Sequence, residues 1–134
     1  MLTRKLGFEL LIGCLVVCGT TAAWGAAAVS DPANAAAKQI LQETGIQGGL
    51  VVHLGCGDGK LTAALRAGDS HLVHGLDADP QNVESARRYV QSLGLYGKVS
   101  IDRMSGDRLP YIDNLVNLIV AEEPGRISTE EMMR

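Results

Sequence analysis

Residues 49–59 read Gly-Leu-Val-Val-His-Leu-Gly-Cys-Gly-Asp-Gly, an apolar run that leads into a turn with glycine at every second position. The run from Leu50 to Leu54 has the aliphatic, β-rich character of a central strand in a parallel sheet. Lys60 then opens a series of good helix formers. A strand, a glycine turn and a helix in this order bring backbone N–H groups against a ligand, because glycine accepts positive φ and has no Cβ.

The spacing of the glycines separates two classes of ligand. Dinucleotide-binding turns carry G-x-G-x-x-G, and their third glycine would fall on Lys60 in this chain. The spacing therefore disfavours an NAD-dependent oxidoreductase, which remains a less favoured alternative. The core Leu54-Gly-Cys-Gly-Asp-Gly59 resembles motif I of the class I S-adenosylmethionine-dependent methyltransferases.

A second motif follows in register with the first. The run Gly75-Leu-Asp-Ala-Asp-Pro80, followed by Ala86-Arg87, resembles the methyltransferase segment after motif I. Asp77 ends the second expected strand, and the ends of adjacent parallel strands reach the same crevice, where a carboxylate accepts hydrogen bonds from a ribose diol. We expect Asp77 to be an exposed strand-end acid and Asp79 to cap the next helix.

The resemblance implies S-adenosyl-L-methionine as the cofactor and a set of residues that contact it. Asp107 follows the third expected strand, where the family places an acid near the adenine amino group, and Glu122 follows the fourth. We interpret Cys56 as a small packing residue, and the sequence assigns neither a catalytic residue nor a metal ligand. The implied cofactor contacts are His53, Gly55, Cys56, Gly57, Gly59, Asp77, Ala78, Gly106, Asp107 and Glu122.

The fold class predicted by this alternation is α/β, a Rossmann-like, doubly wound parallel sheet of about four strands with helices on both faces. The expected strands cover residues 50–54, 71–76, 99–103 and 115–120. The expected helices cover residues 32–44, 60–67 and 80–93, and a further helix begins at Ser128.

Two departures from the family pattern bear on function. His53 occupies the position where motif I usually has an acid that supports the methionine end of the cofactor. The chain also stops at Arg134, before the further strands of the family fold, so we expect residues 32–134 to form a partial domain of a longer product. Similar methyltransferase segments stand at the front of long secreted bacterial proteins. Both departures leave a second hypothesis open, a catalytically degenerate cofactor-binding module.

Residues 1–28 carry a separate signal. Arg4 and Lys5 precede an uncharged stretch from residue 10 to residue 28 that ends in alanines. This pattern is typical of a secretory signal peptide, and an uncleaved membrane anchor is the alternative. We therefore expect export to the periplasm or envelope with transient membrane contact through residues 1–28, and a cytoplasmic location if the signal has no targeting role.

Size and charge limit the remaining classes. A chain of 134 residues forms one domain at most. Its net charge of −3 and its aromatic content of 4% give no basis for a nucleic-acid-binding surface. The sequence therefore predicts methyl transfer from a small-molecule cofactor to an acceptor that it does not identify.

Overall fold

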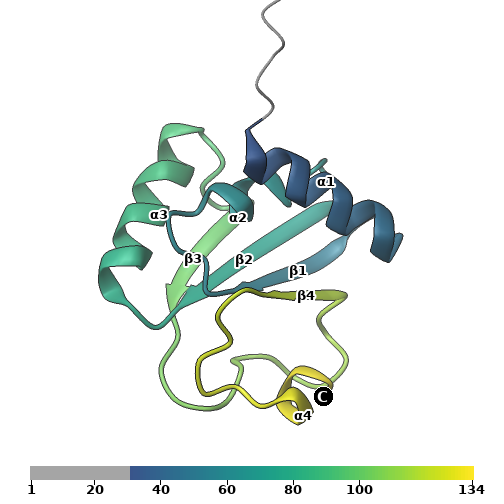
Figure 1. Ribbon diagram of the computed structural model, residues 1–134, viewed down its shortest axis with the longest axis vertical. Helices are drawn as coiled ribbons and strands as arrows, with labels where there is room; N and C mark the ends of the chain where they lie inside the picture. Colours follow the sequence, from purple (N-terminus) through teal and green to yellow (C-terminus); the bar gives the residue numbers. More distant parts are fainter. Residues whose placement is uncertain (1–30) are drawn as a thin grey trace, which may run out of the picture.

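The computed structural model describes residues 31–134, so the signal predicted at residues 1–28 lies outside the described residues. Helices and strands alternate along most of this part of the chain (Figure 1). The elements are α1 (Pro32–Thr44), β1 (Gly49–Leu54), α2 (Lys60–Ala64), β2 (His71–Asp77), α3 (Pro80–Ser92), β3 (Val99–Arg103), β4 (Leu118–Ala121) and α4 (Thr129–Met132).

The four strands form one parallel sheet in the order β3-β2-β1-β4. The chain moves outward from β1 through β2 to β3 and then returns to the other side of β1 to form β4. The strand order therefore reverses between β1 and β4. In open parallel sheets this reversal opens a crevice at the carboxyl ends of the strands.

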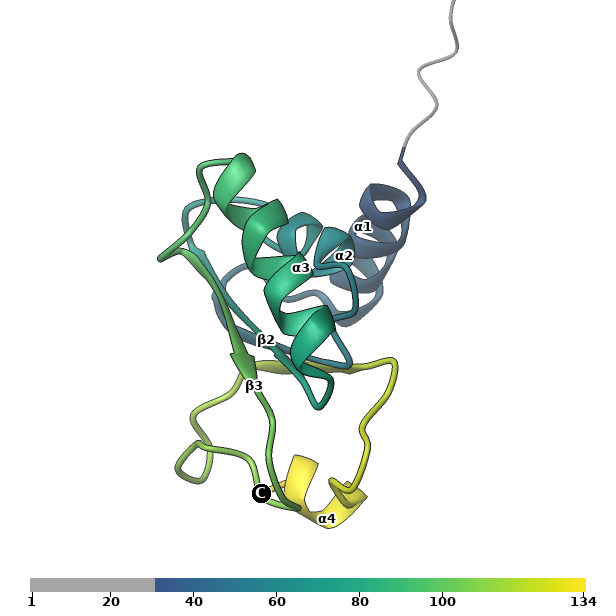
Figure 2. The same cartoon turned by 90° about the vertical axis from the view of Figure 1, so that its left-hand side faces the viewer.

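The two faces of the sheet are covered differently. Helices α1, α2 and α3 lie together on one face, and α4 lies on the opposite side (Figure 2). The three-helix face holds the larger core, which includes the fully buried Val51, Val73 and Ile101. The opposite face holds a smaller core around Leu54 and Leu76, covered by parts of the connections 104–117 and 122–128 and by α4. The predicted doubly wound sheet of four strands is confirmed.

Capping residues define the two long helices as the sequence predicts. Asp31 accepts a hydrogen bond from the N–H of Ala33 at the start of α1, and Asp79 accepts one from Gln81 at the start of α3. Gly45 ends α1 in the left-handed region, with φ of 67°. The predicted helix 60–67 is wrong at its end, because α2 stops at Ala64 and Leu65 turns into the core with no exposed surface.

The fourth strand begins three residues later than the apolar run 115–120 predicts. Asn117 bonds Leu50 with its N–H and its side-chain Oδ1 (both 2.9 Å), so strand pairing with β1 starts only at Leu118. Leu115 and Val116 instead belong to the connection that covers the opposite face of the sheet, where Val116 packs against the smaller core. The apolar character of residues 115–120 does not distinguish the residues that enter β4 from those that belong to the connection.

Within residues 31–134, the helices are all too short or too polar to cross a membrane.

Candidate cofactor site

The candidate site lies where the carboxyl ends of β1, β2 and β4 meet the glycine turn 55–59, a region that we call the carboxyl edge. Backbone hydrogen bonds hold the turn to both neighbouring strands. The N–H of Gly55 donates to the carbonyl of Leu76 in β2 (2.8 Å), and the N–H of Glu122 donates to the carbonyl of Leu54 in β1 (3.0 Å). The turn is therefore fixed at the point where the strand order reverses.

The three glycines of the turn have positive φ, but their surroundings differ. A Cβ at Gly55 would lie 2.6 Å from the backbone nitrogen of Glu123, and a Cβ at Gly59 would lie 2.8 Å from the Cβ of Ala86. These two glycines allow neighbouring chain segments to approach. A Cβ at Gly57 would meet no atom within 4 Å, so the space beside this residue is open to a ligand.

Asp77 ends β2 beside this turn. Its Oδ2 accepts a hydrogen bond from the N–H of Gly57 (3.0 Å), and its Oδ1 accepts one from the N–H of Asp79 (2.8 Å). The amide of Asn82 lies 3.3 Å from both oxygens. The expectation of an exposed acid is wrong, because Asp77 is only 6% exposed and braces the turn. These four contacts take up the two acceptor sites of each carboxylate oxygen, so a ribose hydroxyl would replace one of the longer contacts from Asn82.

His53 lies beneath the turn with no exposed surface. Its Nδ1 is 2.8 Å from the hydroxyl of Thr62 in α2, and its Nε2 is 3.4 Å from Oε2 of Glu122. Burial lowers the pKa of His53 below its ordinary value, although the carboxylate of Glu122 acts in the raising direction. The imidazole is therefore a neutral link between α2 and the end of β4.

Cys56 is the packing residue that the sequence predicts. Its side chain is 3% exposed and belongs to the core under α2 and α3. Burial, followed by the negative charge of Asp77, raises the pKa of its thiol to about 12. A thiol with this pKa carries almost no thiolate at neutral pH, which excludes a nucleophilic role.

The remaining predicted contacts follow the ends of β2 and β3. Ala78 comes directly after β2, Gly106 and Asp107 lie in the connection after β3, and all three are exposed. The segment after β3 is tied to β2 by the N–H of Met104, which donates to the carbonyl of Asp77 (2.8 Å). Their role in adenine binding stays a prediction.

Sequence reasoning missed two residues that organise the site, Thr62 and Asn82. Thr62 is fully buried against His53, and Asn82 bonds Asp77 from the first turn of α3. Each is a small polar residue on the buried or half-buried side of a helix next to a motif. This placement is a usable signal, because a buried polar side chain needs a partner.

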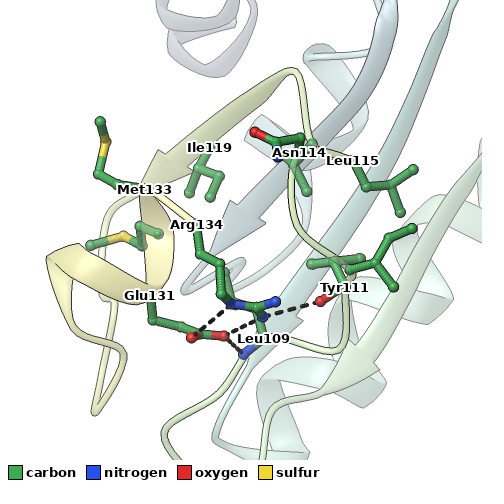
Figure 3. A pocket seen from close by; sticks show the side chains of 11 residues that line it. Leu109, Tyr111, Asn114, Leu115, Ile119, Glu131, Met133 and Arg134 are labelled. Atoms are coloured by element: carbon green, nitrogen blue, oxygen red, sulfur yellow. Dashed lines mark hydrogen bonds and ion pairs between the residues drawn. The ribbon is translucent and has the colours of Figure 1, made fainter.

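A hollow lies away from this edge. It has a volume of about 110 Å³ and lies between residues 109–116 of the connection to β4, Ile119 and the C-terminal residues 131–134, and we call it the α4 cavity. Figure 3 shows Glu131 bonded to Arg134, and the pair bonded to the connection at Leu109 and Tyr111. Glu131 accepts hydrogen bonds from Arg134 (2.7 Å) and from the N–H of Leu109 (2.9 Å), and Arg134 also pairs with Asp113.

The carboxyl edge combines an open space at a glycine turn with an acid at the end of the adjacent strand, which suits a nucleoside-containing cofactor. A family model described as a methyltransferase domain matches residues 51–133. The chain belongs to the S-adenosylmethionine-dependent methyltransferase family. S-adenosylmethionine is the cofactor of this family, and the matched range includes the whole glycine turn, Asp77 and Glu122.

Solved structures share the fold of this methyltransferase domain. A protein of Methanococcus maripaludis assigned as an S-adenosyl-L-methionine-dependent methyltransferase is 26% identical, with a TM-score of 0.62 over 67% of this chain and 42% of its own. A SAM-dependent methyltransferase of Aquifex aeolicus is 26% identical, with a TM-score of 0.57 over 63% of this chain and 46% of its own.

The [4+2]-cyclase SpnF shares the fold at 21% identity, with a TM-score of 0.57 over 64% of this chain and 32% of its own. No curated protein matches the chain. The methyltransferase domain described here thus spans less than half the length of the solved structures it resembles.

Proposed function

We propose that this domain binds S-adenosylmethionine along the carboxyl edge and takes part in methyl transfer to an acceptor. One observation carries the proposal. Gly57 faces open space with φ of +50°, while its N–H is held by Asp77 from the neighbouring strand. This arrangement lets a ligand approach the backbone closely and places a carboxylate beside it.

The residues of the carboxyl edge have different roles in the proposed binding. Asp77 keeps the turn in place, and the ribose hydroxyls replace its 3.3 Å contacts with the amide of Asn82. Gly57 leaves room for the ligand, while Gly55 and Gly59 allow the strand and helix around it to close in. We assign the adenine to Ala78, directly after β2, and to Asp107, in the connection after β3, because both are exposed and β2 and β3 are neighbours in the sheet.

When bound, the cofactor would supply a methyl group on a positively charged sulfur. An acceptor lone pair bonds to the methyl carbon as the carbon–sulfur bond breaks, and S-adenosylhomocysteine leaves. This domain holds the donor in a fixed orientation, which lowers the barrier of a direct displacement because less freedom is lost on reaching the transition state. Nothing in the described residues identifies the acceptor. The whole protein's substrate therefore lies outside this proposal.

A second candidate function is cofactor binding without methyl transfer. His53 favours it, because a neutral, buried imidazole stands where the motif usually supplies an acid. The likeness to a [4+2]-cyclase gives a further reason to separate fold from chemistry. Incubation with S-adenosylmethionine and a panel of acceptors distinguishes the two functions. Formation of S-adenosylhomocysteine that depends on an added acceptor supports methyl transfer. Binding of S-adenosylmethionine without formation of S-adenosylhomocysteine, whichever acceptor is added, supports the second function.

Thermal unfolding with S-adenosylhomocysteine and with NAD tests the proposal. A ligand that binds only the folded state stabilises it, by about 2.7 kcal/mol at a hundred times its Kd. We expect S-adenosylhomocysteine to raise the unfolding temperature and NAD at the same concentration to leave it unchanged. The reverse pattern would contradict the proposal and support a dinucleotide site.

We also propose that residues 1–28 direct export, on the basis of their charge and apolarity pattern alone. The mature chain made in a bacterial host should then begin near Ala26 or Val29. N-terminal sequencing checks this, and a soluble cytoplasmic product that still begins with Met1 would contradict it.

A further inference from the structure

Glu122 is an acid at the end of β4 with an unusual tie to the interior. Its side chain is 58% exposed, yet its Oε2 lies 3.4 Å from Nε2 of His53, whose side chain has no exposed surface. The distance is a close polar contact that is long for a hydrogen bond, and Nε2 is otherwise a buried polar atom without a partner. A buried polar atom of this kind, directed at a solvent-facing acid, needs an explanation.

The surroundings of the imidazole determine where its proton lies. An unprotonated Nε2 would direct a lone pair at the carboxylate of Glu122, which is repulsive. The favoured tautomer therefore carries its proton on Nε2, directed at Glu122, while Nδ1 accepts from the hydroxyl of Thr62 (2.8 Å). Thr62, His53 and Glu122 form a chain that starts in α2 and ends at the carboxyl edge.

These three residues resemble a nucleophile–histidine–acid triad in composition but not in exposure. Thr62 has no exposed surface, so its hydroxyl cannot meet a substrate. Glu122 is the one member that reaches solvent. The arrangement can therefore orient a carboxylate at the surface, and it cannot activate the hydroxyl.

The position of Glu122 defines what this carboxylate can meet. β1 separates the end of β4, which carries Glu122, from the end of β2, which carries Asp77. A cofactor whose ribose lies at Asp77 has two ends, of which one extends over β3 and the other crosses the turn toward β4. The adenine of S-adenosylmethionine is uncharged, whereas its amino acid end carries an ammonium group. A carboxylate complements the ammonium, so the amino acid end belongs over β4.

We propose that Glu122, held in place by His53 and Thr62, binds the ammonium group of the amino acid end of the cofactor. This inference rests on the proposed cofactor binding at the carboxyl edge. The inference also explains why position 53 can be a histidine. Glu122, at the end of β4, supplies the negative charge, and the buried imidazole of His53 positions the carboxylate. Glu122 is then a binding residue, and His53 and Thr62 are positioning residues.

Two adenosine ligands test the inference. S-adenosylhomocysteine carries the amino acid end, and 5′-methylthioadenosine shares the adenosine and thioether but lacks that end. Calorimetry with the full 134-residue chain should give a tighter Kd for S-adenosylhomocysteine. Glu122→Gln should weaken S-adenosylhomocysteine by about ten-fold to a hundred-fold and leave methylthioadenosine unchanged, because a charge-assisted hydrogen bond is lost from one ligand only.

Glu123→Gln is the matched control, since it removes the same charge one position away on an exposed residue. It should leave the affinities for both ligands unchanged. If Glu122→Gln weakens both ligands equally, or neither, the inference is overturned while cofactor binding stands. If the wild-type chain binds neither ligand, cofactor binding fails and the inference fails with it.

The positioning role of His53 has its own readout. His53→Gln keeps an N–H group that can point to Glu122, and His53→Leu removes it. We expect His53→Leu to reduce the preference for S-adenosylhomocysteine over methylthioadenosine, and His53→Gln to restore most of it. A preference that is the same in both folded variants would overturn the positioning role, and the Glu122→Gln result is independent of whether either variant folds.

Discussion

The carboxyl edge and the α4 cavity are two regions of residues 31–134 that are rich in polar groups, and they differ in what those groups do. In the α4 cavity, Glu131 and Arg134 pair with each other (Figure 3), and Arg134 also pairs with Asp113. At the carboxyl edge, Gly57 faces open space and the side chain of Glu122 is 58% exposed.

The polar groups of the α4 cavity satisfy one another, whereas Glu122 at the edge faces solvent. Glu131 and Arg134 hold the C-terminal residues to the 109–116 connection through Leu109 and Tyr111. The edge is open, but its turn is braced before any ligand arrives. Preorganisation of this kind reduces the cost of ordering a site upon binding.

The largest expected effect comes from filling the open space beside Gly57. Gly57→Val should abolish binding of S-adenosylhomocysteine, because the branched side chain enters the ligand's space and suits neither the turn nor its φ of +50°. Calorimetry measures the affinity. Gly94→Val is the control, because Gly94 also has positive φ (+66°) and a Cβ there would likewise meet no atom within 4 Å, but it lies at the far end of α3. Loss of binding in both variants would contradict a specific role for Gly57.

The next effect separates Asp77 from Asp79. Asp77→Ala leaves the N–H groups of Gly57 and Asp79 without their acceptor, so we expect a stability loss of about 3 kcal/mol and ligand binding weakened by at least ten-fold. Asp79→Ala removes only the cap of α3, with a loss of about 1 kcal/mol and unchanged affinity. Denaturant unfolding and calorimetry measure the two quantities, and the opposite assignment of the binding loss would show that the ribose does not lie at Asp77.

A smaller effect, confined to stability, is expected in the α4 cavity. Hydrogen bonds from Arg134, and then from the N–H of Leu109, lower the pKa of Glu131 to about 2. A carboxyl with a lowered pKa stabilises the fold above its ordinary pKa of 4.5, and this stabilisation is lost as the pH falls toward 2. Glu131→Gln should therefore reduce stability at neutral pH and flatten the acid side of the stability profile, with the affinity for S-adenosylhomocysteine unchanged. A change in that affinity would mean that the two regions are coupled.

The smallest expected effect is the pH dependence that arises from His53. Burial lowers its pKa below the ordinary value of 6.5, so below this pH the unfolded chain takes up a proton that the folded chain does not. Stability from this source is intact above pH 6.5 and falls as the pH drops below it. The unfolding midpoint should fall less between about pH 7 and pH 5 in His53→Gln than in the wild type. An equal fall in both would show that His53 does not contribute.

The sequence predicted the order of the elements because their local signals agree with the tertiary fold. Aspartate before proline marks the starts of α1 and α3, and glycine stands beyond the end of each helix. The boundary errors at α2 and β4 have a common cause. Leu65 and Leu115 belong to apolar runs whose direction is set by contacts with distant segments, and periodicity carries no information on these.

The candidate site was predictable in its members and less so in their roles. The glycine spacing and the acid at the end of β2 identified Gly57 and Asp77, because both depend on local chain geometry. The burial of Asp77 and its bonds to Asn82 required the packing of α3 against the turn. The contact between His53 and Glu122 joins residues 69 positions apart, and only the placement of β4 beside β1 brings them together.

The most direct test of cofactor binding at the carboxyl edge is a titration of the ¹⁵N-labelled chain with S-adenosylhomocysteine, followed by amide NMR. We expect the amide signals of Gly55, Gly57 and Ala78 to shift with a common saturation curve, and those of Tyr111 and Met133 at the α4 cavity to stay in place. Shifts centred on the α4 cavity, with the glycine turn unaffected, would contradict cofactor binding at the carboxyl edge.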